Sequence, residues 1–323
     1  MDKETERRLI VVSNRLPFQL LEKGSSITLK ESDGGLVSAL KSYFEGTHAE
    51  DRVTSKWWIG SAEFPEKRWK KFQASKKNTV SSFEVEPIFI DSKVYNRYYN
   101  GFCNATLWPL FHYVPSFVEF DDATFHAYEE ANRCFADKIV SMLRPGDVLW
   151  VHDYQLMLVP GMVREKCPEA TIGFFLHIPF PSFEIFRILH RPWKEKIMQG
   201  LLGADLIGFH THEYVQHFLK TVQMVTGYDY QYRSILLPDR VVSADMFPLG
   251  IDFHKFHDAV NNPAVMQEKL SIRNNFGDKK IIFSVDRLDY TKGITHRLTG
   301  FERFLERYPE WREKVVFVLV VVP

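Results

Sequence analysis

The sequence predicts an α/β protein with doubly wound parallel sheets, and three observations support this fold class. Short apolar runs alternate with helical patterns along almost the whole chain of 323 residues, and strands that alternate with crossover helices form parallel sheets. The run Val315–Val322 is apolar throughout, as is typical of a parallel strand buried on both faces. The pattern breaks at residues 248–263, where P-L-G-I-D-F-H-K-F-H precedes N-N-P. We therefore expect a first domain over residues 1–250 and an incomplete second domain over residues 251–323.

Hydrophobic periodicity places the individual elements. Short runs rich in Val, Ile, Leu and Phe predict strands at Leu9–Ser13, Trp57–Gly60, Glu84–Ile90, Val148–His152, Thr171–His177, Leu206–His210, Ile281–Val285 and Val315–Val322. Apolar residues at three- or four-residue steps predict helices at Gly35–Phe44, Ala123–Leu143, Leu156–Lys166, Pro192–Leu202, Glu213–Thr226 and Ile294–Tyr308. In the longest of these helices the apolar face consists of Phe125, Tyr128, Phe135, Ile139 and Met142.

Composition excludes several classes of function. Hydrophobic residues make up 45% of the chain, which is ample for a core, and 41 Lys+Arg balance 41 Asp+Glu. Because no global charge attracts polyanions, we expect neither nucleic acid nor an acidic membrane as a partner. The three cysteines, Cys103, Cys134 and Cys167, are far apart and form no Cys-x-x-Cys pair, as expected for reduced thiols in a cytoplasmic protein.

Neither end of the chain resembles a membrane or export segment. The charged start, M-D-K-E-T-E-R-R, leads into only four apolar residues, Leu9–Val12, which are too few for a signal peptide. The longest apolar run, Val315–Val322, is far shorter than a bilayer span. This run ends next to Pro323, and buried parallel strands do not normally end a protein. We therefore expect the chain to be a fragment cut within its second domain.

The segment I-I-F-S-V-D-R-L-D-Y-T-K-G at residues 281–293 is the most informative stretch of the chain. An apolar strand runs into a polar turn that contains Arg287 and Lys292, and a helix is predicted after Gly293. Ligands of open α/β sheets bind beyond the carboxyl ends of strands, and helix N-termini favour anions. The two cations therefore suit a phosphorylated ligand. The alternative is a pair of surface cations in a loop.

A second candidate for anion binding is the sequence S-D-G-G-L-V-S-A-L at residues 32–40, where Gly34 and Gly35 precede a predicted helix. Two glycines bring bare backbone N–H groups to a helix N-terminus, which allows close approach of an anionic or sugar ligand. The alternative is a flexible helix entry. The chain contains neither a G-x-G-x-x-G dinucleotide motif nor a Walker A motif.

Polar residues follow three of the predicted strands in the first domain. Asp153 and His177 stand at the carboxyl ends of V-L-W-V-H and F-F-L, and Arg15 follows Leu9–Ser13. A carboxylate there can accept a hydrogen bond from a substrate hydroxyl, an imidazole can donate one, and an arginine can bind phosphate through two hydrogen bonds. The alternatives are a capping Asp and a packed His.

Two aromatic residues between these strands are candidates for a sugar site. Tyr99 and Trp108 belong to Y-Y-N-G-F-C-N-A-T-L-W-P. Core packing is the first interpretation of both, but their amphipathic rings could also form the wall of a sugar site.

A possible metal motif at His212, Glu213 and His217 does not fit zinc. The spacing is H-E-x-x-x-H, and five helical steps separate the two histidines by about 140° around the axis, so they cannot share one ion. We predict polar helix residues here and no metal site.

Six motifs, in this order and spacing, resemble the trehalose-6-phosphate synthase family from about residue 9 to the end. They are V-V-S-N-R-L-P, D-G-G-L, Y-Y-N-x-x-x-N-x-x-L-W-P-x-F-H-Y, W-V-H-D-Y, F-F-L-H-I-P-F-P-x-x-E and R-L-D-Y-x-K-G. The resemblance implies the GT-B fold, in which two Rossmann-like domains face each other across a cleft. It also implies transfer of glucose from UDP-glucose to glucose 6-phosphate with retention at the anomeric carbon and without a metal or other cofactor.

The resemblance assigns a role to each matching residue of this chain. Residues 1–250 would bind the acceptor and residues 251–323 would belong to the nucleotide-sugar domain. Arg15 is similar to a ligand of the acceptor phosphate. The resemblance places Tyr99, Trp108 and Asp153 on the acceptor sugar, and Gly34, Gly35 and His177 around the donor glucose and its phosphates. It places Arg287 and Lys292 on the UDP diphosphate. The catalytic residues that it implies are Asp153, His177, Arg287 and Lys292.

Two departures from the family pattern leave alternatives open. The family usually has W-x-G-W where this chain has W-W-I-G-S, so Ser61 replaces a tryptophan of the acceptor site. Another residue could fill the place of this tryptophan, or the acceptor could differ, for example glycerol 3-phosphate or an aminocyclitol phosphate. The chain could also be the synthase part of a synthase/phosphatase fusion. The chain also lacks the Arg that follows the last strand, the later D-G-M-N-L-V segment and the Glu for the UDP ribose. We therefore expect negligible transfer by residues 1–323 alone.

Two further possibilities concern assembly. A catalytically silent regulatory subunit would keep the fold and bind sugar phosphate without turnover, but such homologues tend to lose the charged residues that are intact here. A homo-oligomer, or an associated phosphatase domain, is also compatible with the sequence.

Overall fold

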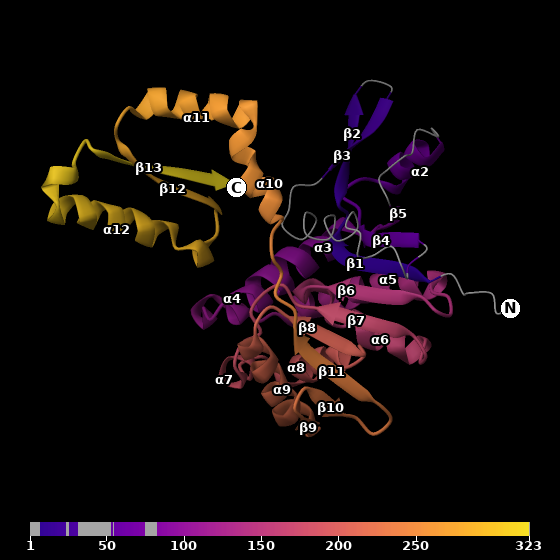
Figure 1. The fold of residues 1–323 in the computed structure, drawn as a ribbon. Coiled ribbons are helices and arrows are strands. Elements are labelled where there is room, and N and C mark those ends of the chain that lie inside the picture. Colours follow the sequence, from indigo (N-terminus) through magenta and orange to yellow (C-terminus); the bar gives the residue numbers. More distant parts are fainter. Residues whose placement is uncertain (1–6, 24–25, 32–52, 54, 75–82, 323) are drawn as a thin grey trace. The chain divides into compact units, whose positions relative to one another are not determined.

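Nine strands form one sheet in the computed structural model, with the apolar strands of residues 148–209 at its centre (Figure 1). The structure describes residues 7–23, 26–31, 53, 55–74 and 83–322. The strand order is β5-β4-β1-β6-β7-β8-β11-β10-β9. The bounds are β1 Arg8–Arg15, β4 Ser55–Ser61, β5 Glu84–Ile88, β6 Val148–His152, β7 Thr171–Phe175, β8 Leu206–Phe209, β9 Tyr230–Gln231, β10 Ser234–Leu236 and β11 Val241–Met246.

The parallel part of this sheet has the order of a doubly wound nucleotide-binding fold. From β5 to β8 every neighbouring pair is parallel. Apart from β2 and β3, which form a separate sheet, these strands in chain order read 3-2-1-4-5-6. The order reverses between β1 and β6, which pair from Leu9↔Val148 to Val12↔Val151. Ligands of such sheets bind at this reversal, outside the carboxyl ends of the strands.

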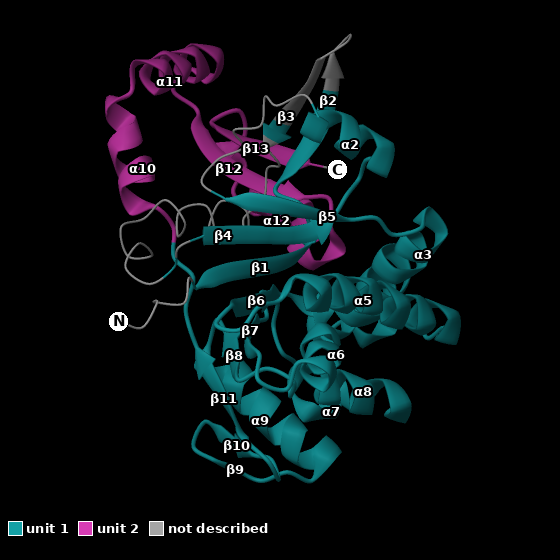
Figure 2. Ribbon diagram, turned by 90° about the vertical axis from the view of Figure 1, so that its right-hand side faces the viewer, with its two compact units in different colours: residues 1–250 teal, residues 251–323 magenta. Residues whose placement is uncertain are grey.

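Alternating side chains of β1 supply both faces of the sheet with core residues. Ile10 and Val12 belong to a large cluster with helices α5, α6, α8 and α9, whereas Leu9 and Val11 pack with α2 and with β2. Figure 2 shows α5, α6 and α8 along one side of the strands. The helices of this unit are α2 Glu66–Ala74, α3 Ser92–Asn96, α4 Trp108–Phe111, α5 Asp122–Met142, α6 Val159–Lys166, α7 Phe183–Phe186, α8 Arg191–Leu201 and α9 His212–Thr226.

Helix α5 shows how the sequence fixes a helix of this unit. Asp121 caps its N-terminus by accepting a hydrogen bond from the backbone N–H of Ala123 (2.9 Å). Phe125, Tyr128, Phe135 and Ile139 are buried, with exposed fractions of 2% or less, so the predicted apolar face is confirmed. Met142, which was predicted on the same face, is half-buried and packs against this core.

Several boundaries and elements differ from the prediction. The helix predicted from Leu156 begins at Val159, because Pro160 fits only the first turn of a helix. The strand predicted to end at His177 ends at Phe175. The prediction also missed the hairpin of β2 (Phe18–Lys23) and β3 (Ser26–Glu31) and the antiparallel edge β11-β10-β9. The helix predicted at Gly35–Phe44 lies outside the described residues.

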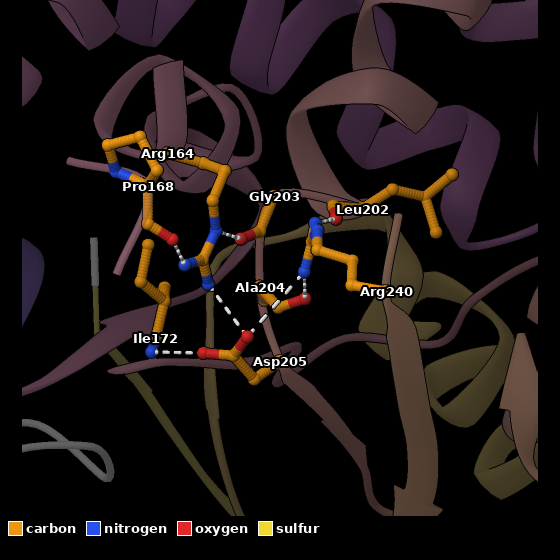
Figure 3. Close-up of polar contacts among 8 residues, drawn as sticks. All are labelled: Arg164, Pro168, Ile172, Leu202, Gly203, Ala204, Asp205 and Arg240. Carbon is orange, nitrogen blue, oxygen red and sulfur yellow. Dashed lines mark hydrogen bonds and ion pairs between the residues drawn. The ribbon is translucent and has the colours of Figure 1, made fainter. Parts of the chain in front are cut away.

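Asp205 fixes the amino ends of β7 and β8 (Figure 3). Its Oδ2 accepts a hydrogen bond from the backbone N–H of Ile172 (2.7 Å), and its Oδ1 accepts one from Arg164 Nη2 (2.7 Å). Arg240 Nη1 lies 3.5 Å from the same oxygen. The remaining guanidinium N–H groups donate to the carbonyl oxygens of Pro168, Leu202, Gly203 and Ala204. This network lies at the edge of the sheet opposite the carboxyl ends of the strands.

Helices α6 and α8 contact each other through glycine. An added Cβ on Gly161 would lie 2.9 Å from Gly200 Cα, and one on Gly203 would clash with the backbone nitrogen of Gly161. Because no real Cβ approaches another atom so closely, the two helix backbones depend on glycine for this packing distance.

The chain divides into two units, Met1–Gly250 and Ile251–Pro323, which Figure 2 shows in teal and magenta. In the second unit β12 (Lys280–Arg287) and β13 (Val315–Val322) pair in parallel, from Lys280↔Val315 to Arg287↔Val322. The helices are α10 Phe253–His257, α11 Pro263–Phe276 and α12 Ile294–Arg307. No side chain of residues 251–322 is buried, and Phe283 on β12 is 65% exposed.

Among the helices that the structure describes, none combines the length and the apolar composition that crossing a bilayer requires.

Candidate active site

The candidate site of the first unit lies at the carboxyl ends of β1, β6 and β7, where the strand order reverses. Arg15 ends β1, Asp153 directly follows β6, and His177 follows β7. Parallel pairing brings these three positions to one edge of the sheet. The sequence therefore placed the residues on the edge where open α/β sheets bind ligands.

Arg15 projects from this edge with a half-exposed side chain (50%). Its guanidinium lies over the Tyr99 ring, with Cζ 4.8 Å from the ring centroid. Nε donates to Tyr95 Oη (3.3 Å) and forms an ion pair with Glu63 Oε1 (3.2 Å). The cation is thus held by two tyrosines and one carboxylate, which leaves half of it open to a ligand.

A buried polar network beneath Arg15 fixes its backbone. Asn14 Oδ1 accepts a hydrogen bond from Tyr98 Oη (2.9 Å), and Asn14 Nδ2 donates to Tyr95 Oη (3.3 Å). Ser61, at the position where the resemblance led us to expect a tryptophan, is 3% exposed and donates from Oγ to the carbonyl oxygen of Asn14 (2.5 Å). Ser61 is therefore a structural residue of the β1–β4 edge.

Asp153 has an unusual backbone and an unusual pKa. Its φ angle is 74°, a left-handed conformation that residues other than glycine rarely adopt and that recurs at functional sites. The backbone N–H donates to Phe175 O (2.8 Å), and Oδ1 accepts from the backbone N–H of His177 (3.2 Å). Burial raises the pKa of Asp153 to about 6, against the opposing effect of hydrogen bonds from Tyr154 and His177.

Three histidines meet beside Asp153. His177 Nε2 lies 3.0 Å from Nδ1 of His152, and the His177 ring packs edge-on against His210 at 5.6 Å. Burial lowers the pKa of His177 to about 3, with a further contribution from His210. His177 is therefore a neutral imidazole at physiological pH, able to exchange hydrogen bonds but not to supply a charge.

Tyr99 and Trp108 stand on an uncommon element. Tyr99 lies within a π-helix, Arg97–Leu107, and Trp108 begins α4 directly after it. π-Helical geometry is rare and frequent at functional sites. Tyr99 stacks on Tyr95 (5.6 Å), and Trp108 packs against Tyr154 (5.8 Å), the residue after Asp153. Both predicted aromatics are half-buried.

The remaining predicted residues lie elsewhere. Gly34 and Gly35 fall outside the described residues. In the second unit Arg287 ends β12, and Lys292 follows in a turn at Tyr290–Lys292. Asp289 caps this turn through Thr291 N (2.8 Å), and Gly293 takes a left-handed φ of 60° before α12. The strand–turn–helix order predicted from the sequence is confirmed.

His217 serves a structural purpose. Its Nδ1 lies 3.1 Å from the carbonyl oxygen of Phe180, and its Nε2 lies 3.9 Å from Glu213. Within the described ranges, no three His, Cys, Asp or Glu side chains are grouped so that they could hold a metal ion.

Sequence analysis missed three residues of this edge, namely Tyr95, Glu63 and His152. Tyr95 and Glu63 contact Arg15 from 80 and 48 positions away in the chain, and no local pattern announces such pairs. His152 could have been predicted from the sequence, because it stands directly before Asp153 at the end of a predicted strand.

The raised pKa of Asp153 predicts how stability depends on pH. Between about pH 4 and pH 6 the native state of the first unit holds a proton that its unfolded state has lost, so the free energy of unfolding of the first unit falls as pH rises through this window. Compared with Asp153→Asn, the wild type should lose up to about 3 kcal/mol of its free energy of unfolding between about pH 4 and pH 6. Urea unfolding of both proteins, followed by tryptophan fluorescence at several pH values, measures the difference. A pH-independent difference would show that the pKa is not raised.

Comparison with known proteins identifies the family of this chain. Residues 7–323 match the model of glycosyltransferase family 20. The bifunctional trehalose-6-phosphate synthase/phosphatase of Thermoproteus tenax is 41% identical over 98% of this chain and 42% of its own length. The UDP-forming alpha,alpha-trehalose-phosphate synthase of Burkholderia xenovorans, solved with glucose-6-phosphate, has a TM-score of 0.77 at 28% identity and covers 97% of this chain and 65% of its own.

An E. coli structure described as trehalose-6-phosphate bound with UDP-2-fluoro glucose has a TM-score of 0.80 at 27% identity, covering 97% of this chain and 64% of that one. The chain thus spans less than two thirds of the length of these proteins. The likenesses confirm the α/β fold of the GT-B type and the resemblance noted in the sequence. Because the family model matches almost the whole chain, the chain belongs to glycosyltransferase family 20.

Proposed function

We propose that the protein transfers glucose from UDP-glucose to glucose 6-phosphate, with retention at the anomeric carbon, and so forms trehalose 6-phosphate and UDP. The observation that carries this proposal is the half-open cation of Arg15 at the reversal of the strand order, held over the Tyr99 ring. A guanidinium suits a phosphate dianion, and an aromatic ring suits the apolar face of a sugar. A sugar phosphate combines both.

The acceptor is held by residues of the first unit. Arg15 binds the phosphate, while Tyr99 and Trp108 line the sugar. Asp153, once ionised, accepts a hydrogen bond from a sugar hydroxyl, and its backbone contacts with Phe175 and His177 hold the carboxylate in place. A fixed acceptor hydroxyl reacts at a high effective concentration, which is the main contribution of positioning to catalysis.

The donor roles are assigned to each unit separately. In the first unit, His177 and the backbone of Gly34 and Gly35 are assigned to the donor glucose and its phosphates. In the second unit, Arg287 and Lys292 are assigned to the charge of the diphosphate. The bond from C1 to UDP breaks and the acceptor oxygen bonds to C1 on the same face, which retains the configuration. The proton of the acceptor hydroxyl passes to the leaving diphosphate oxygen, so no protein nucleophile is required. The contribution of the protein to this step is to position the sugars and stabilise charge on the leaving oxygens.

Release of UDP from UDP-glucose tests the proposal. The assay uses the longest natural form of the protein that carries this chain, with and without glucose 6-phosphate. Release that depends on glucose 6-phosphate supports the proposal and shows that Ser61 is compatible with this acceptor. Release only with glycerol 3-phosphate or an aminocyclitol phosphate would assign another acceptor. Binding of UDP without release would favour a regulatory subunit.

Arg15→Ala is expected to raise the KM for glucose 6-phosphate by about tenfold or more, because a charge-assisted hydrogen bond to phosphate is lost. The KM for UDP-glucose should stay nearly unchanged. Arg133→Ala removes an exposed cation from α5 and serves as the control. Unaltered dependence on the acceptor in Arg15→Ala would contradict the role of Arg15.

The setting of the enzyme also belongs to this proposal. We propose a cytoplasmic protein, which the free thiols at Cys103, Cys134 and Cys167 support, and a reaction that uses no metal cofactor. A fused or associated phosphatase domain is supported by the bifunctional relative.

A further inference from the structure

His152 and His177 contact each other at the carboxyl ends of β6 and β7. His152 ends β6 and is 1% exposed. Its Nδ1 lies 3.0 Å from Nε2 of His177, and the two rings stack at 5.2 Å with an interplanar angle of 27°. At this distance one nitrogen must donate and the other must accept.

The surroundings leave both imidazoles neutral. Trp150 packs on His152 from the same strand, and Phe175 of β7 packs on His177. The titratable groups that face the pair are Asp153, whose Oδ1 accepts the backbone N–H of His177, and His210 beyond β8. Burial lowers the pKa of both His152 and His177. Each ring therefore carries one proton, on one of its two nitrogens.

The second nitrogen of His152 decides where these protons lie. His152 Nε2 is buried and has no hydrogen-bond partner within the described part of the chain. If His177 donated to His152, the proton of His152 would sit on Nε2 as a buried N–H without an acceptor. If His152 donates from Nδ1, Nε2 carries only a lone pair. In proteins, a buried N–H group without an acceptor is rarer than a buried acceptor without a donor.

We propose that His152 donates its Nδ1–H to Nε2 of His177 and thereby holds His177 in the tautomer that carries its proton on Nδ1. His152 is then a positioning residue. It fixes the ring of His177 and presents the Nδ1–H as a hydrogen-bond donor, in the way a buried partner sets the tautomer of a catalytic or metal-binding histidine. That this donor serves a sugar hydroxyl rests on the function proposed above.

The tautomers can be measured without any turnover. In long-range ¹H–¹⁵N spectra of this chain, protonated and bare ring nitrogens have distinct shifts. We expect His152 protonated on Nδ1 and His177 protonated on Nδ1, with Nε2 bare on both rings. A His177 ring protonated on Nε2 would overturn the proposal, whatever reaction the protein catalyses.

Two substitutions at position 152 separate positioning from packing. His152→Leu removes the donor, and the His177 signals should become those of mixed tautomers. His152→Asn keeps an amide N–H near the place of Nδ1, and the single tautomer should persist. A single Nδ1 tautomer in both variants would show that another group orients His177.

Turnover of the longest natural form supplies the second readout. His152→Leu should lower kcat by about ten- to a hundredfold, as loss of a group behind a functional histidine does, with little change in the KM for glucose 6-phosphate. His152→Asn should restore most of the loss. In a His177→Ala background, His152→Leu should cost nothing more, because the residue through which it acts is gone. An equal loss in both backgrounds contradicts the proposal. If the wild type itself releases no UDP, the proposed function fails, and the tautomers still decide this inference.

Discussion

Replacing Lys292 or Arg287 with alanine is expected to lower the rate of glucosyl transfer by about a hundredfold or more, because in the proposed function each removes an oriented cation from the diphosphate leaving group. The turn that carries Lys292 is held by Asp289, Thr291 and Gly293 rather than by the exposed Lys292 side chain. The fold of the second unit should therefore survive the substitution. The loss should appear in kcat, since charge on the leaving oxygens grows in the transition state.

Steady-state UDP release and thermal melting, measured on the same preparations of the longest natural form, test this expectation. Lys269→Ala serves as the matched control, because Lys269 is an exposed lysine on α11 of the same unit. A control rate equal to wild type shows that removing a charge from this unit is not harmful in itself. A large fall in the melting temperature of Lys292→Ala would instead mean that this cation is structural.

Gly203→Ala is expected to destabilise the first unit by about 3 kcal/mol or more, as overpacking does where the backbone cannot move away. The new Cβ would clash with the backbone of Pro160 and Gly161 at the start of α6. A flexible side chain could yield to it, but two packed main chains cannot. Neighbouring Gly200 has the same constraint, because its Cβ would clash with Met157 O and lie 2.7 Å from Leu158 Cα.

Urea unfolding followed by tryptophan fluorescence measures this effect, since Trp311 is the only tryptophan outside the first unit. The control is Gly250→Ala, because a Cβ at Gly250 would meet no atom within 4 Å. We expect its free energy of unfolding to stay within about 0.5 kcal/mol of wild type. A stable Gly203→Ala protein would show that α6 and α8 can separate without loss.

The fold could be predicted where local pattern and tertiary role agree. The strand Val148–His152 matches its prediction to the residue, and α5 differs by one residue at each end. The prediction failed where neighbours decide the structure. The short strands β9 and β10 are held by pairing at the sheet edge, and no strong periodicity marks them.

The candidate site could be predicted in part, for a related reason. Residues at the carboxyl ends of parallel strands share one edge, so Arg15, Asp153 and His177 were predictable from strand order alone. Their supports were not. The contact of His152 with His177 depends on the register of β6 and β7. The contact of Tyr95 with Arg15 depends on how α3 lies against the end of β1.

The absence of buried side chains between residues 251 and 322 has a consequence for hydrogen exchange. Amides of β1 lie in the middle of the sheet among Ile10, Val11 and Val12, which are 0% exposed, and should exchange only when the whole first unit opens. Strands β12 and β13 have only each other as neighbours, and none of their described side chains is buried. Their amides should exchange through low-energy local openings, so the unfolding of this chain is not one cooperative event, and a single free energy cannot describe it.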